Sequence, residues 1–319
     1  MGSHSLLGEM VATERTPCAF KRWRKFVIRS QTFLALPILA VLGVPVFAQV
    51  DLSGSWAYRS ALGNVGGPRP VDYEGLPLND AGRARALSYS ESQLSMPERQ
   101  CLFYAPTYLM LGPFGLKIWN ETNPDSGSTI AWKIGAWEDR APITIWMDGR
   151  PHPSKNAYHE KGGFTTGVWE REILTTYTTH MKANMIRRNG TPSSDQATMT
   201  LHFIRHDDLL TVTASVEDPI YLSEPVHWTR MFQLDPEAPI PSAGPPCIVA
   251  DEGPKEGAVP FYLPGKNPFV GEMTKLYNIP EEAVLGGAET MYPEFRKKIK
   301  DNYVIPGKCV RDCGTPTGR

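Results

Sequence analysis

The sequence predicts a mainly β protein built as an antiparallel β-barrel, with a β-sandwich as the alternative. Three observations support this fold class. The 319 residues include 29 Pro and 28 Gly, which favours many turns over long helices. From Cys101 onward, apolar and aromatic runs of five to nine residues recur between Gly, Pro, Asn and Asp. These runs do not alternate with helical segments, so a parallel sheet with crossover helices is not expected.

Residues 1–48 are typical of a presequence that ends in a secretory signal peptide. An apolar stretch, Thr32–Phe47, follows a positively charged segment and is followed by Ala48, a small residue suited to cleavage. An uncleaved anchor helix is the alternative, but Pro37, Pro45 and a length below the ~20 residues of a membrane span argue against it. We therefore expect an exported protein, periplasmic or secreted, with no stable membrane span after signal removal. The positive charges are those of Lys21, Arg22, Arg24, Lys25 and Arg29.

The β-barrel domain is expected over residues 49–234. A first strand is expected at Asp51–Trp56, followed by a helical segment at 80–89 that begins after Asn79 or Asp80. Ten further strands complete the domain. Their expected ranges are 101–104, 107–111, 115–121, 128–135, 142–148, 164–169, 172–180, 197–206, 209–217 and 226–234.

The pairing of the strands at 197–206 and 209–217 can be derived in register. With Asp207-Asp208 as a two-residue turn, one face of the hairpin is almost wholly apolar and the other is mostly polar. A slip by one residue would mix the two faces, so the pattern itself fixes the register. The expected pairs on the apolar face are Arg205–Leu210, Phe203–Val212, Leu201–Ala214 and Met199–Val216.

Residues 235–319 are expected to form a Pro-rich wrap and short helices packed on the barrel. The first part carries the string PEAPIPSAGPP and shows little periodicity. Helical patterns return at 269–278, 280–285 and 292–301, each with a proline within one residue of its start.

Four cysteines remain after the presequence: Cys101, Cys247, Cys309 and Cys313. An even number in an exported chain predicts two disulfides, for which three connectivities exist. Cys309 and Cys313 are close enough in sequence to pair locally, which would leave Cys101 to pair with Cys247. A zinc site is the alternative, although the CVRDC stretch lacks the neighbouring His or Cys ligands that zinc needs.

His180, His202, Asp148 and His152 are the candidate catalytic residues. Asp148 and His152 flank a Gly-Arg-Pro turn, where the carboxylate could fix the tautomer of the imidazole; alternatively, Asp148 only caps backbone N–H groups. His202 and His206 lie four residues apart on one strand, about 13 Å, which is too far to share a metal ion. The histidines could instead be ordinary polar-face residues.

Arg187, Arg188 and Asn189 form the candidate ligand-binding turn, to which His159 and His206 are added. Paired guanidinium groups suit the capture of an anion or a carboxylate, whereas the simpler interpretation is an exposed turn. The formal net charge of −1 and the lack of a Lys/Arg-rich block in the body argue against nucleic acid as a partner. No nucleotide-binding, hydrolase or metalloprotease motif identifies a reaction or a cofactor, and metal binding stays open.

Several strings together resemble a widespread group of exported proteobacterial and acidobacterial proteins: DLSGSW, WMDGRPHP, TTGVWEREILTTYTTHMK, RRNGTPSSDQATMTLHFIRH, VEDPIYLSEP, YLPGKNPF and GGAETMYPE. The resemblance covers nearly all of the chain after the presequence and implies a lipocalin-like barrel, without implying an activity. The chain departs from the group's pattern at Arg171-Glu172, Leu201 and Phe261. His180, Arg188, Asn189, His202, Asp148 and His152 match it.

Three functions remain in competition. The first is an exported barrel that binds a small, largely apolar molecule. The second is an enzyme, a hydrolase or isomerase of apolar substrates, that uses the His, Asp and Arg residues at the barrel mouth, with or without a metal. The third is an envelope or assembly protein whose tail wraps a partner.

Overall fold

A computed structural model describes the chain at residues 50–59, 71–73, 75–90, 101, 104–110, 115–135, 142–237 and 259–299. The predicted presequence, Cys247, Cys309, Cys313 and most of the Pro-rich wrap lie outside the described residues, so the disulfide pairing stays a prediction. Within the described ranges, no helix has the length and apolar character needed to cross a bilayer.

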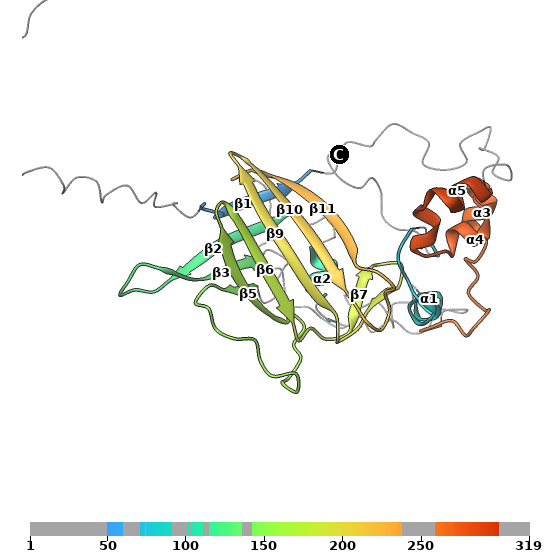
Figure 1. Ribbon diagram of the computed structural model, residues 1–319, viewed down its shortest axis with the longest axis horizontal. Coiled ribbons are helices and arrows are strands. Elements are labelled where there is room, and N and C mark those ends of the chain that lie inside the picture. The colour runs from blue at the N-terminus through green and yellow to red at the C-terminus, as the bar shows by residue number, and fades with distance from the viewer. Residues whose placement is uncertain are drawn as a thin grey trace, which may run out of the picture. The chain divides into compact units, whose positions relative to one another are not determined.

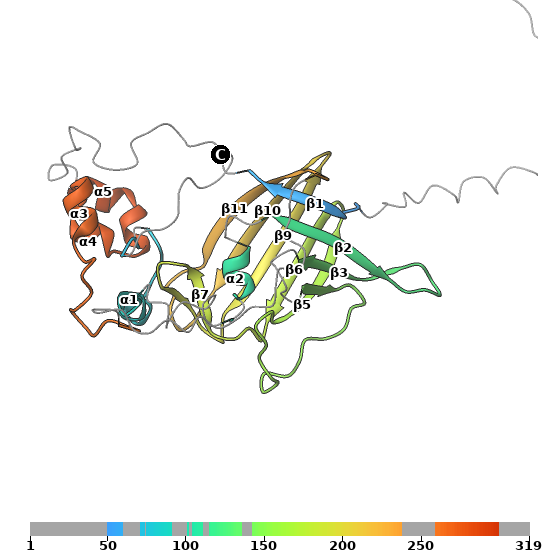
Figure 2. The same ribbon diagram turned by 180° about the vertical axis from the view of Figure 1, so that it is seen from behind.

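Nine strands close into a β-barrel (Figures 1 and 2). Their order around the barrel is β1-β11-β10-β9-β6-β5-β4-β3-β2. Because the strands form a closed ring, the expected barrel is confirmed and the alternative, a β-sandwich, is wrong. The strands are β1 Gly54–Tyr58, β2 Leu116–Thr122, β3 Thr129–Gly135, β4 Ile143–Trp146, β5 Phe164–Glu170, β6 Ile173–Thr179, β9 Thr198–His206, β10 Leu209–Glu217 and β11 Val226–Leu234.

The barrel is mixed, because β4 and β5 run parallel, with Ile145 opposite Thr165 and Trp146 opposite Thr166. All other neighbours in the barrel are antiparallel. The expectation of a fully antiparallel barrel is therefore wrong at this one pair. The physical reason is the connection: residues 147–163 cross back along the barrel, as parallel strands require, where a hairpin would give an antiparallel pair.

The derived register of the β9–β10 hairpin is confirmed. Phe203 lies opposite Val212, Leu201 opposite Ala214 and Met199 opposite Val216. These side chains are at most 3% exposed, so the apolar face points into the barrel. The alternation of apolar and polar residues thus decided which face is buried.

Three segments differ from the sequence-based expectation. Cys101 and Tyr104, the described residues of the strand expected at 101–104, lie in no strand. The strand expected at 107–111 is instead a buried helical turn, α2 Pro106–Leu109, which begins with proline at its first position. Conversely, β7 Asn184–Arg187 and β8 Thr191–Ser193 form a separate two-stranded sheet that was not expected. An apolar run this short does not distinguish a strand from a helical turn by periodicity.

The barrel interior and α2 share one hydrophobic core. Trp56, Phe203 and Phe232 from the strands are at most 1% exposed, and Met110, which ends α2, belongs to the same cluster. The Trp228 indole N–H of β11 donates to the Met110 carbonyl oxygen over 3.3 Å. Strand β11 therefore holds the end of α2 against the apolar interior.

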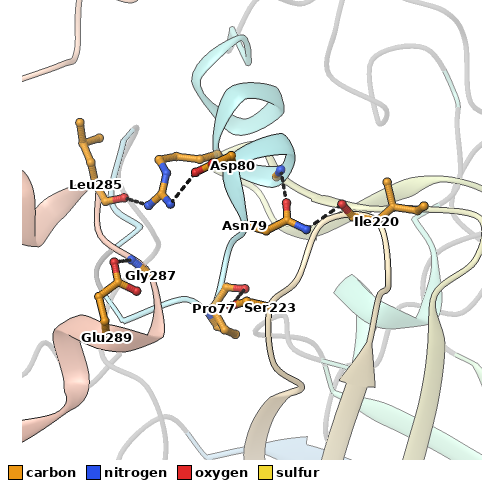
Figure 3. Close-up of polar contacts among 10 residues, drawn as sticks. Pro77, Asn79, Asp80, Ile220, Ser223, Leu285, Gly287 and Glu289 are labelled. Carbon is orange, nitrogen blue, oxygen red and sulfur yellow. Dashed lines mark hydrogen bonds and ion pairs between the residues drawn. The ribbon is translucent and has the colours of Figure 1, made fainter.

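Helix α1, Asp80–Leu87, begins after Asn79 as expected, because the Asn79 side chain accepts a hydrogen bond from the Gly82 N–H. Figure 3 shows that the same side chain also donates to the Ile220 carbonyl oxygen (2.9 Å) in the loop between β10 and β11. In that loop, Ser223 donates from its backbone N–H to the Pro77 carbonyl oxygen over 2.8 Å. One capping residue thus fixes both the start of α1 and its place beside the barrel loop.

The C-terminal segment is helical where the three proline-initiated patterns lie. Arg83 of α1 donates to the Leu285 carbonyl oxygen, and Gly287 donates to the Glu289 carboxylate (Figure 3). The Thr290 hydroxyl accepts from the Gly75 N–H over 3.1 Å. The helices are α3 Glu272–Tyr277, α4 Glu281–Val284, the 3-10 helix η3 Ala288–Met291 and α5 Pro293–Ile299.

Candidate functional site

The apolar inner face of the barrel carries three polar atoms that lack a hydrogen-bond partner. They are the indole nitrogens of Trp132 on β3 and Trp169 on β5, and the hydroxyl of Thr176 on β6. Each lies on the inward face, since Trp132 is paired with buried Ile145, and Trp169 with buried Leu174. The strands β3, β4, β5 and β6 are consecutive neighbours in the barrel, so the three atoms occupy one side of its interior.

Leaving these three buried atoms without a hydrogen-bond partner lowers the stability of the fold. A buried donor or acceptor without a partner costs about 1–3 kcal/mol, and most buried polar groups in proteins do have a partner. On the same face, the Thr165 and Thr178 hydroxyls satisfy each other over 2.8 Å. The contrast indicates that the positions of Trp132, Trp169 and Thr176 suit a polar atom supplied from outside the chain.

Charged side chains of both signs, Arg187, Arg230 and Asp72, lie near one another beside β7. Arg230 points inward from β11, is 9% exposed, and lies 5.7 Å from the centroid of the Tyr58 ring. Burial lowers the pKa of Arg187 on β7, Asp72 opposes this shift, and the charge of Arg230 adds to it. The charge of Asp72 acts on Arg187 more strongly than that of Arg230, so this region holds a carboxylate together with its two guanidinium groups.

The predicted turn around Arg187 is thus only partly a surface feature. Asn189 is 1% exposed; its amide donates to the Asp72 carbonyl oxygen over 2.8 Å, and its carbonyl oxygen accepts from the Thr191 hydroxyl over 2.7 Å. Asn189 therefore holds the turn in place instead of facing a ligand. Arg188 is exposed, while Arg187 is half-buried near Arg230.

His152 and His180 are joined by a chain of hydrogen bonds. The Thr179 hydroxyl lies 2.8 Å from Nδ1 of His152 and 2.7 Å from Nδ1 of His180. At the ends of the chain, Nε2 of His152 lies 2.9 Å from the Thr166 hydroxyl, and Nε2 of His180 lies 2.9 Å from the Ser154 carbonyl oxygen. The structure thus brings together two of the four residues predicted to be catalytic.

The direction of this chain follows from the Ser154 carbonyl oxygen, which can only accept. Nε2 of neutral His180 must carry the proton, so its Nδ1 accepts from the Thr179 hydroxyl, which in turn accepts from Nδ1–H of His152. Burial and the neighbouring His180 lower the pKa of His152. The His159 ring lies 5.1 Å from the His180 ring, so a third predicted residue joins the cluster.

Asp148 does not orient His152. Its carboxylate binds the guanidinium of Arg150, with 2.5 Å between Oδ2 and Nη2, and this contact lowers the pKa of Asp148 to about 2. Arg150 in turn stacks on Trp146, with 3.5 Å from the guanidinium carbon to the ring centroid. The expected Asp148–His152 pair is therefore replaced by an ion pair on the barrel exterior.

His202 and His206 lie apart from the histidine cluster. His202 is on the outer face of β9, where its Nδ1 lies 3.0 Å from the Thr175 hydroxyl. His206 is exposed at the end of β9 nearest Ile173, whereas His180 follows the opposite end of β6. Among the described residues, no three His, Cys, Asp or Glu side chains gather as a metal site would require.

Sequence reasoning missed the inward polar residues, Trp132, Trp169, Thr176 and Arg230. The period-two alternation of their strands places them on the inner face, so this signal could have found them. Whether a hydroxyl or an indole finds a partner depends on strands far apart in sequence, and no local pattern reports it.

Comparisons with protein-family models, with curated proteins and with solved structures found no match.

Proposed function

We propose that this chain is an exported barrel protein that binds a small, largely apolar molecule carrying at least one hydrogen-bond acceptor. The observation that carries the proposal is the set of buried, unpartnered polar atoms on a largely apolar inner face: Trp132 Nε1, Trp169 Nε1 and Thr176 Oγ1. The presequence supports export.

The chemistry of the inner face defines the ligand class. Aromatic and aliphatic side chains such as those of Phe203, Phe232 and Leu174 would contact the apolar body. Indole N–H groups only donate, so Trp132 and Trp169 call for an acceptor such as a carbonyl oxygen.

Binding to this interior is supported more strongly than catalysis. Both ring nitrogens of His152 and of His180 already contact oxygen atoms of the chain itself. A general base must instead reach a substrate proton. The histidine cluster is therefore assigned a structural part, and the unpartnered atoms of the interior a binding part.

The test is titration of the chain lacking residues 1–48 with a medium-chain methyl ketone and with the matching alkane, followed by tryptophan fluorescence. Thr176→Val removes the hydroxyl at nearly constant shape, and Trp132→Phe removes the indole N–H. Thr211→Val, on the outer face of β10, is the matched control. We expect saturable binding of the ketone, weakened about 2- to 10-fold by each interior variant, in line with ~0.5–1.5 kcal/mol per hydrogen bond.

Two results would overturn the proposal. One is the absence of saturable binding by either compound. The other is a ketone affinity that Thr176→Val and Trp132→Phe leave at the wild-type value. Thr211→Val must match wild type for the comparison to stand.

A further inference from the structure

A pocket of about 310 Å³ lies outside the barrel interior. It is formed where the end of α1 meets the β7–β8 hairpin and the first described residues of the C-terminal extension. None of its lining residues belongs to the nine barrel strands. The residues that matter for its chemistry are Arg85, Tyr89, Lys161, Gly190, Tyr221 and Phe261.

The walls of this pocket are set by close backbone approaches. Gly190 has a φ of 91°, and a Cβ atom there would lie 2.2 Å from Cβ of Tyr89. Only glycine therefore lets Tyr89 pack on the turn. Tyr89 also forms an isolated antiparallel bridge with Phe261, and Tyr262 donates from its N–H to the Ser88 carbonyl oxygen over 2.8 Å.

The C-terminal extension thus supplies one wall of the pocket. Phe261 is 55% exposed although it is clamped by its backbone to the end of α1. An exposed aromatic ring on a fixed backbone at a pocket rim is suited to stacking on a planar ligand. Tyr89 and Tyr221 add two more aromatic surfaces to the lining.

The charge of the lining is positive. Arg85 and Lys161 are the charged residues among the described lining, which includes no carboxylate. Arg85 is exposed, and its guanidinium reaches the Ser88 hydroxyl only at 3.4 Å, the long limit of a hydrogen bond. Ser88 therefore holds the guanidinium group only weakly. A guanidinium group suits a carboxylate, which it can bind through two parallel hydrogen bonds.

We propose that this pocket binds a small aromatic carboxylate. The ring lies against Tyr89 and Phe261, the carboxylate binds Arg85, and Lys161 adds a second positive charge. The volume is at the lower end of the ~300–1,000 Å³ of ligand pockets, which limits the ligand to one or two rings. This site is separate from the one proposed for the barrel interior and does not depend on it.

The experiment compares indole-3-acetate with its neutral counterpart indole-3-acetamide, using calorimetry and ligand-observed NMR on the chain lacking residues 1–48. We expect the carboxylate to bind at least tenfold more tightly than the amide, and Arg85→Gln to remove this advantage. Arg171→Gln, which alters an exposed cation at the β5–β6 turn, is the matched control and should bind as wild type. Phe261→Ala, at a half-exposed position, should weaken both compounds several-fold.

Three results would overturn the proposal: equal binding of carboxylate and amide, wild-type binding by Arg85→Gln, or loss of binding in Thr176→Val. The last result would place the probe in the barrel interior. Circular dichroism of each variant confirms that its fold is retained, and Arg85→Gln and Phe261→Ala act at exposed positions, so loss of binding in either reports on the pocket.

Discussion

The imidazoles of His152 and His180 share one hydroxyl group, that of Thr179, which lies 2.8 Å from the first ring and 2.7 Å from the second. The two residues come from the crossover 147–163 and from the position after β6. When both rings are neutral, every donor in the chain from Thr166 to Ser154 meets an acceptor. This arrangement uses the neutral form of His152, whose Nε2 accepts from the Thr166 hydroxyl and whose Nδ1–H donates to Thr179.

We expect the thermal stability of the protein to fall as the pH is lowered through the range in which histidine titrates. The pKa of His152 is lowered in the folded state by burial and by His180, so the unfolded state binds a proton more readily. The contribution of His152 is thus fully present above its unfolded pKa of about 6.5 and is lost as the pH falls below that value toward the folded pKa.

The measurement is Tm as a function of pH from 5 to 8. His152→Gln should reduce the change of Tm with pH in this range. Asp148→Asn should not, because Asp148 pairs with Arg150 and titrates with a pKa of about 2. A slope that His152→Gln leaves intact would contradict the assignment.

Two threonines of β6 should respond oppositely to the same substitution. Thr176→Val removes a buried hydroxyl without a partner, so the free energy of unfolding of the ligand-free protein should rise by about 1 kcal/mol. Thr178→Val removes the hydrogen bond to the Thr165 hydroxyl and leaves that buried hydroxyl without a partner. The free energy of unfolding should therefore fall by about 1–2 kcal/mol. Urea unfolding of both variants checks this, and changes of the same sign would contradict it.

Asp218 should be among the least replaceable acidic residues of the described barrel loops. Its carboxylate, 3% exposed, accepts from the Ser194 N–H (2.6 Å), the Ser194 hydroxyl (2.8 Å) and the Ile220 N–H (2.9 Å). Asp218→Asn places an amide donor against these donors, which should cost about 2–4 kcal/mol of unfolding free energy. Glu217→Gln, at the exposed neighbouring position, is the control and should stay within ~0.5 kcal/mol of wild type in the same urea titration.

We expect the chain that remains after removal of the proposed signal peptide to contain no free thiol. Four cysteines remain after residues 1–48, and the prediction is two disulfides in one of three connectivities, of which Cys309–Cys313 with Cys101–Cys247 is the one that local pairing would give. Thiol titration of the unreduced, denatured protein checks the number, and peptide mapping checks the pairing. Detection of free thiols at stoichiometric level would contradict the prediction.

The sequence predicted the strands whose two faces differ. In β9 and β10, Phe203 and Val212 alternate with polar residues, so range, register and buried face all followed from the pattern. The pattern failed at residues 107–111, where the apolar run is as long as one helical turn and Pro106 favours a helix start. Local alternation also carries no information on whether β4 meets its neighbour β5 in parallel.

The candidate site was predictable only in part. The Gly-Arg-Pro turn before His152 and the turn at Arg187 identified residues that do lie in polar clusters. Their partners, Thr179 and Arg230, come from strands distant in sequence, so the clusters depend on the closed barrel. The Asp148–His152 pair was expected from proximity along the chain, but Arg150 lies nearer and carries a full positive charge.

The strand count of the barrel has a topological consequence. A ring in which every neighbour is antiparallel closes only with an even number of members, so nine strands require at least one parallel seam. That seam, β4 against β5, has two paired positions, fewer than the seven of β5 against β6. His152 spans it: the residue follows β4 in the chain, yet its ring contacts Thr166 of β5. The imidazole thus ties the crossover that leaves β4 to β5, beside the pair of strands with the fewest paired positions in the barrel.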